Sequence, residues 1–221
     1  MSILSPEEII KKTEEFVQKT LANAEAGHGW WHIDRVRKNT LRIAHAEGAD
    51  LFIAELGALL HDIADHKFNG GDHTLGPRVT REWLESQHVE RVVIDAVCDI
   101  VLNNSFRSLR SQNGMTSLEG KCVQDADRLE ALGAIGLARC IMYGAHAKRP
   151  MYVPDPPLSL DAPWQVNEQS KAPSTLHHFY EKLLHLKDKM NTKTGTELAQ
   201  EGHLFLEKYV EQFLKEWNGV G

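Results

Sequence analysis

The sequence contains few cysteines, and their placement excludes two classes of protein. Its 221 residues include only Cys98, Cys122 and Cys140, and no two of them form a CxxC pair. Each lies in an apolar segment with helical spacing, so neither a disulfide framework nor a zinc-thiolate site is expected. We predict three free, buried thiols.

Long apolar runs are also missing. No stretch approaches the roughly 20 apolar residues that a membrane-spanning helix needs, and the opening MSILSPEEIIKKTEEF lacks the features of a signal peptide. We therefore expect a cytoplasmic protein with no membrane partner. Positive charge is in deficit, with 25 Lys and Arg against 31 Asp and Glu, which argues against binding of polymeric nucleic acid. Small anionic substrates stay compatible with this balance if positive groups are concentrated locally.

Alternating strand patterns are absent, and helical patterns take their place. Ser5, Pro6 and Glu8 predict a capping box at the start of the first helix, Asp50 is a predicted N-cap, and Thr194 to Glu197 has a capping-box pattern. Apolar residues recur at helical spacing in about residues 5–24, 30–46, 51–64, 74–86, 89–102, 117–143, 174–190 and 197–217. The sequence predicts an all-α protein in which 51–64, apolar on nearly all sides, is the buried centre.

The length of the chain favours one domain spanning residues 1–221. Residues 103–116 are polar and read as a loop, and a bend is expected near Gly133 or Gly136 inside the 117–143 helix. Most of the prolines fall between about residues 145 and 173. A stretch this long without periodicity is usually functional, so we predict a flap beside the site, followed by C-terminal helices over about 174–217.

The sharpest chemical signal is the pair His61-Asp62 at the end of the most apolar predicted helix. A neighbouring imidazole and carboxylate at the edge of a core are costly to desolvate unless they are paired or bound to a metal. The alternative is a helix-terminal histidine beside a surface aspartate. His32 is the preferred further ligand from upstream, and Asp127, at the start of another apolar segment, completes the set; a solvated acidic turn is the alternative for Asp127.

Such a set suits particular metals. Imidazole nitrogens and carboxylate oxygens favour one divalent ion among Mn, Mg, Fe, Ni, Co and Zn. Asp125 lies two positions from Asp127 and is expected on the surface side of the helix. His28 lies one turn before His32, and we assign it to substrate or the outer part of the site.

Cations near these residues are candidates for binding phosphate oxygens. Lys67, Arg35 and Arg128 are close in sequence to the predicted ligands. Arg35 and Arg128 have the alternative of pairing with nearby aspartates. Ser105 and Arg107 are predicted to line the pocket from the next loop. Trp30 and Trp31 are expected to be core residues rather than a platform for stacking a base.

These residues carry a resemblance to a known family. The order His32, His61-Asp62, Asp127 resembles the H…HD…D signature of the HD superfamily of metal-dependent phosphohydrolases. The segments HGWWHIDRV, LLHDIADHKF, NNSFR, DADRLEALGAIGLAR and HHFYEKLLHLKDKMNT are similar to a bacterial group of small stand-alone HD-domain proteins. The resemblance covers essentially the whole chain. It implies an HD-type helical bundle, with a metal core over about 28–145, and the four signature residues as ligands of one metal.

The resemblance also implies roles for the residues after the HD pair. Asp65 matches an acidic position that helps to activate water in related nucleotide pyrophosphohydrolases, and His66 stands where those relatives have a second acidic residue. We assign catalysis to Asp65 and Lys67, and substrate binding to His28, Arg35, His66, Arg128, Ser105 and Arg107. In the C-terminal segment, Gly202 stands where this group is expected to have a basic residue.

The predicted function is hydrolysis of a phosphoester or phosphoanhydride bond in a small phosphorylated metabolite, with nucleotides as the leading class. A metal-containing binding or signalling domain without turnover is the second hypothesis, and a di-iron oxygenase is the third. A homodimer is compatible with the sequence.

Overall fold

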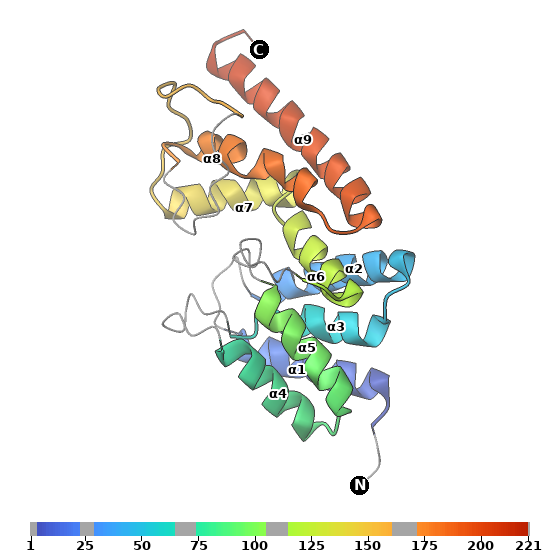
Figure 1. Ribbon diagram of the computed structural model, residues 1–221. Coiled ribbons are helices and arrows are strands. Elements are labelled where there is room, and N and C mark those ends of the chain that lie inside the picture. The colour runs from blue at the N-terminus through green and yellow to red at the C-terminus, as the bar shows by residue number, and fades with distance from the viewer. Residues whose placement is uncertain (1–3, 23–28, 65–73, 105–114, 161–171, 221) are drawn as a thin grey trace. The chain divides into compact units, whose positions relative to one another are not determined.

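The computed structural model describes residues 4–22, 29–64, 74–104, 115–160 and 172–220. Within these ranges every regular element is a helix (Figure 1), which confirms the predicted all-α class. Among the helices that lie in these ranges, none is both long and apolar enough to cross a lipid bilayer.

The chain divides into two compact units, residues 1–126 and 127–221. Among its described residues, the first unit holds five complete helices and most of a sixth. They are α1 (Pro6–Thr20), α2 (Trp30–Glu47), α3 (Leu51–Leu60), α4 (Leu75–Ser86), α5 (Arg91–Asn103) and α6 (Leu118–Leu129). The boundary between the units falls inside α6, after Ala126.

Helix α3 forms the centre of the first unit, as its apolar sequence predicts. It contacts α1, α2 and α5, and its residues from Leu56 to Leu60 are fully buried. At Gly57 an added Cβ would lie 3.1 Å from the Ile100 side chain on α5. The absence of a side chain at this position therefore lets α3 and α5 approach closely.

Two helix starts in this unit follow the predicted capping chemistry. Glu8 N–H donates to Ser5 Oγ at 3.3 Å, and Ser5 N–H donates to the Glu8 carboxylate at 2.8 Å, which is the capping box. Asp50 accepts from Ile53 N–H at 3.1 Å. The Asp50 N–H in turn donates to the carboxylate of Glu119 at 3.0 Å, so that a residue of α6 also caps α3.

Two helix ends differ from the prediction. Helix α1 ends at Thr20 rather than near residue 24, and α3 ends at Leu60 rather than at Ala64. Residues 61–64 form turns, and His61 keeps helical backbone angles (φ −56°, ψ −33°) as the C-cap. The HD pair therefore follows the helix instead of forming its last turn.

The second unit contains α7 (Gly133–His146), α8 (Thr175–Glu181), the 3₁₀ helix η2 (Leu183–Lys189) and α9 (Lys193–Trp217). The prediction of one bent helix over 117–143 is wrong. Leu132 is extended (φ −117°, ψ 168°) and Gly133 has φ +61°, so α6 and α7 are separate helices. The predicted 174–190 helix is likewise divided into α8 and η2.

Helix α9 begins at Lys193, so the capping box predicted over Thr194 to Glu197 is wrong. Thr192 is the N-cap, and its hydroxyl accepts from Gly195 N–H at 2.9 Å. Farther along, a Cβ added at Gly202 would lie 2.9 Å from Leu132 Cβ and 3.0 Å from Gly133 N. This close approach of α9 to the start of α7 leaves no room for a basic side chain to start from position 202.

The described part of the proline-rich stretch is attached to this unit. Ala145 and His146, at the start of the predicted flap, lie in α7 instead. After α7, Pro150 accepts from Thr175 N–H at 2.9 Å, and His177 Nε2–H donates to the Pro156 carbonyl at 2.8 Å. The Tyr152 ring lies edge-on to Trp217, with centroids 5.1 Å apart. Residues 161–171 of the predicted flap lie outside the described residues, and its position beside a site stays a prediction.

Candidate metal centre

The first turn of α2 supplies one ligand candidate. Gly29 is the N-cap of this helix, and its carbonyl accepts from His32 N–H at 3.0 Å. His32 points inward with Ile33 and Val36, and only 3% of it is exposed. A buried imidazole requires a partner, because its ring nitrogens would otherwise lose their hydrogen bonds to water.

His61, directly after α3, supplies that partner. Its Nδ1 lies 2.8 Å from the carbonyl oxygen of Ala58. Because a carbonyl only accepts, Nδ1 carries the hydrogen, and the lone pair of the neutral ring is on Nε2. His61 Nε2 lies 3.3 Å from His32 Nε2. The backbone of α3 thus sets the tautomer in which Nε2 of His61 is available as a ligand.

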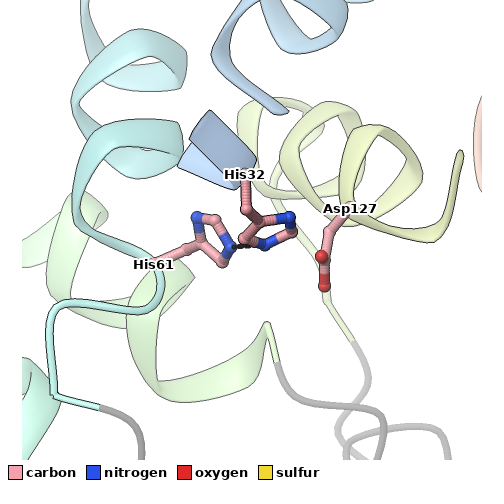
Figure 2. A group of neighbouring side chains, drawn as sticks. All are labelled: His32, His61 and Asp127. Carbon is pink, nitrogen blue, oxygen red and sulfur yellow. Dashed lines mark hydrogen bonds between the residues drawn. The ribbon is translucent and has the colours of Figure 1, made fainter. Parts of the chain in front are cut away.

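Asp127 adds a carboxylate from α6. Figure 2 shows the side chains of His32, His61 and Asp127 directed toward one another, and one potential ligand atom from each lies within 4.8 Å of the other two. Asp127 follows Ala126 in the same continuous helix. The structure therefore brings together three residues that are far apart in the sequence.

Asp62 lies beside both imidazoles. Its Oδ2 is 3.7 Å from His32 Nε2 and 3.8 Å from His61 Nε2. About a fifth of the Asp62 side chain is exposed, at 21%. An oxygen almost equidistant from the two nitrogens suits a fourth ligand of a shared ion.

The spacing of the donors fits a divalent ion. Two nitrogens bound at about 2.0–2.1 Å and separated by an angle of about 90–110° at the metal lie about 2.8–3.4 Å apart. The observed 3.3 Å between the two Nε2 atoms falls in this range. Two nitrogens and two carboxylate oxygens suit the borderline-to-hard divalent metals.

Comparison with known proteins identifies the family. Residues 30–132 match the HD domain family. The YpgQ protein of Bacillus subtilis is 36% identical over 215 residues, which cover 96% of each chain. The chain belongs to the HD family. The resemblance inferred from the H…HD…D signature is thereby confirmed.

Solved structures of HD proteins have the same fold. The crystal structure of an HD-superfamily hydrolase from Bacillus thuringiensis superposes with a TM-score of 0.78 at 40% identity, and the match covers 97% of this chain and 99% of that one. A structure of YpgQ in complex with ADP gives a TM-score of 0.76 at 33% identity, over 96% of this chain and 97% of that chain. This HD protein is thus related to HD-superfamily hydrolases over nearly its full length.

Several predicted site residues of this HD protein lie outside the described residues. They are His28, Asp65, His66, Lys67, Ser105 and Arg107. Two predicted site arginines lie in the described residues. Arg35 is partly buried on α2. Arg128 is 2% exposed, and its Nη1 donates to the carbonyl of Lys189. This bond gives Arg128 a structural partner within the second unit.

Three further features differ from the sequence-based predictions or were not among them. Asp125 was expected on the surface side of its helix, and this is wrong, because the residue is fully buried. Trp30 packs against the core of the first unit as expected, but Trp31 is 70% exposed. The role of the Ala58 carbonyl was not foreseen, since a backbone acceptor leaves no mark on the side-chain sequence; only its spacing, three residues before a helix-terminal histidine, hints at it.

Proposed function

We propose that this HD protein is a metal-dependent phosphohydrolase that cleaves a phosphoester or phosphoanhydride bond of a small phosphorylated metabolite, with nucleotides as the leading class. The observation that carries the proposal is the convergence of His32, His61 and Asp127 within 4.8 Å. Nε2 of His61 is held in its ligating form by the bond from Nδ1 to Ala58. The complex of the related YpgQ with ADP supports a phosphorylated ligand.

Each residue has a distinct part in this proposal. His32, His61, Asp62 and Asp127 would hold the ion. A bound divalent ion would neutralise phosphoryl oxygens and lower the pKa of its water. Asp65 would orient the attacking water or accept its proton, a role that is typically worth about 10²–10⁴-fold in rate.

Cationic and polar side chains complete the catalytic and binding parts of the site. Lys67 and Arg35 stabilise the charge that develops on phosphate oxygens. His28, His66, Ser105 and Arg107 contact the remainder of the substrate. Arg128 is expected to keep the bond from Nη1 to the Lys189 carbonyl when it binds substrate. Breaking that bond would leave a buried charge without a partner, which is costly.

The test combines metal analysis with a hydrolysis screen. Purified wild-type protein is assayed against nucleotides and phosphomonoesters with each of the six metals, in parallel with Asp127→Ala. Asp99→Ala is the matched control, because it removes an exposed carboxylate from α5, outside the ligand group. Loss of metal and activity in Asp127→Ala but not in Asp99→Ala supports the proposal. An Asp127→Ala protein that keeps both would show that the ion lies elsewhere.

A second variant separates hydrolysis from binding without turnover. Asp65→Asn keeps the size of the side chain but removes its basicity. If the protein is a hydrolase, this variant binds metal normally and loses turnover. A metal-replete wild type that hydrolyses none of the phosphorylated compounds would favour the binding-domain hypothesis instead.

A further inference from the structure

Two adjacent tryptophans in the first turn of α2 have different environments. Trp30 packs against the core of the first unit, whereas Trp31 is 70% exposed. A tryptophan side chain carries a large apolar surface that is normally mostly buried. Trp30 therefore accounts for the attachment of this turn to the core, whereas most of the Trp31 side chain lies outside the packing of the described residues.

Trp31 lies close to the proposed metal centre on the same helix. Consecutive residues diverge by about 100° around a helix, and side chains reach about 5–6 Å from its axis, so the ends of two neighbouring side chains lie about 8–9 Å apart. His32 points to the metal centre. A ribose and its 5′-phosphate can therefore span the distance between the indole of Trp31 and the ligating edge of His32.

The charges on this side of α2 are compatible with a phosphorylated ligand. Arg35 follows His32 by three positions, which places it about 60° around the helix in the direction of Trp31, and Trp31 and Arg35 are i,i+4 neighbours. The carboxylate on the far side of Trp31 belongs to Asp34, and Lys38 Nζ lies 2.6 Å from its Oδ2. The Asp34 carboxylate is therefore paired with a lysine.

We propose that Trp31 is the surface on which the base of a nucleotide substrate stacks while its phosphates lie at the metal centre. The inference rests on the proposed phosphohydrolase function and names its substrate class. Every base presents an aromatic face, so stacking of this kind selects nucleotides over other phosphate compounds without selecting one base. Trp31 is accordingly a specificity-determining residue for the proposed reaction.

The experiment compares a substrate that has a base with one that lacks it. KM and kcat are measured for ATP and for inorganic tripolyphosphate with the full-length wild type, Trp31→Ala and Trp31→Phe. Trp217→Ala is the matched control, because Trp217 is 47% exposed and lies on α9. A second readout is tryptophan fluorescence during titration with ADP.

The proposal expects Trp31→Ala to raise KM for ATP by about 5- to 150-fold, the range found for loss of one stacked base. The rise for tripolyphosphate should be much smaller, Trp31→Phe should keep most of the affinity for ATP, and Trp217→Ala should match wild type. ADP should quench the fluorescence of wild type more than that of Trp31→Phe.

Other outcomes would overturn it in distinguishable ways. Equal changes in KM for ATP and tripolyphosphate would mean that Trp31 has a structural role. Unchanged kinetics with an altered oligomeric state would mean that the indole packs against a second copy of the chain. A wild type that hydrolyses neither compound contradicts the proposed function itself, whereas an active wild type with an unaffected Trp31→Ala contradicts only this inference.

Discussion

His61 can bind a metal through one nitrogen because its other nitrogen is occupied. The Nδ1–H bond to Ala58, at 2.8 Å, fixes both the tautomer and the plane of the ring. His32 Nε2 then faces the lone pair of His61 Nε2 at 3.3 Å. A hydrogen on His32 Nε2 or an ion shared by the two rings satisfies both nitrogens, so the same geometry can be stable with and without metal.

The buried thiol of Cys122 gives a prediction at this scale. Burial raises the pKa of Cys122 to about 12, with a further contribution from Asp125. At pH 8 only about 10⁻⁴ of such a thiol is the reactive thiolate. We expect iodoacetamide to leave Cys122 unmodified in the native protein under conditions that label all three cysteines of the urea-unfolded chain, as read by peptide mass spectrometry.

Cys140 is the internal comparison for this measurement. Burial also raises its pKa, to about 11, and it is partly exposed, so it should react before Cys122. Labelling of native Cys122 at the rate of the unfolded chain would contradict the burial.

Since the folded pKa of Cys122 exceeds the unfolded value of about 8.5, its contribution to stability is complete below pH 8.5 and declines as the pH rises toward 12.

Single residues differ in how well the sequence predicts them. The sequence predicts that His32, His61 and Asp127 share a site, and the structure brings these three side chains together; their role as ligands stays a prediction. Asp125 could not be placed, because α6 is buried around its whole circumference from Cys122 to Ala126. A helix without a solvent face gives no surface side to which a polar residue can be assigned.

At the scale of elements, local chemistry predicts some of the helix starts. Ser5 and Asp50 cap their helices as predicted, because a capping side chain and the N–H groups it accepts from are three residues apart. Helix interruptions depend on more distant contacts. The separation of α6 from α7 requires Gly133 at φ +61°, whereas the sequence predicts only a bend near Gly133 or Gly136.

Gly202 provides a test of this packing. Replacing an ordinary helical glycine by alanine stabilises a helix by about 0.5–1 kcal/mol. At Gly202 the new Cβ would lie 2.9 Å from Leu132 Cβ and 3.0 Å from Gly133 N, well inside normal contact. We therefore expect Gly202→Ala to have the opposite effect. It should lower the free energy of unfolding, measured in urea, by about 1–3 kcal/mol.

The neighbouring position is the control for Gly202→Ala. Glu201 is exposed on α9, so Glu201→Ala should change the free energy of unfolding by less than about 0.5 kcal/mol. A Gly202→Ala protein that is more stable than wild type would mean that α7 and α9 are not in close contact at this point.

At the scale of the whole molecule, the proposed centre links segments that no local pattern connects. His32 and His61 belong to the first unit, and Asp127 directly follows its last residue in α6. The sequence predicts these residues as a set through the signature of the HD family. It does not predict the 3.3 Å between the imidazoles, because that distance depends on how α2 packs against the end of α3.

Metal binding should therefore stabilise the folded chain as a whole. The ligands converge only in the native state, and an ion that binds this state alone stabilises it by about 2.7 kcal/mol when its free concentration is 100 times Kd. For a protein of this size such a gain raises Tm by about 5–10 °C. We expect that shift between EDTA-treated and metal-loaded wild type in circular dichroism melts.

Asp99→Ala should keep the shift, because Asp99 lies outside the ligand group, and Asp127→Ala should lose most of it. If Asp127→Ala gained as much stability from metal as wild type does, α6 would contribute no ligand, and the centre would reduce to residues of α2 and the turn after α3.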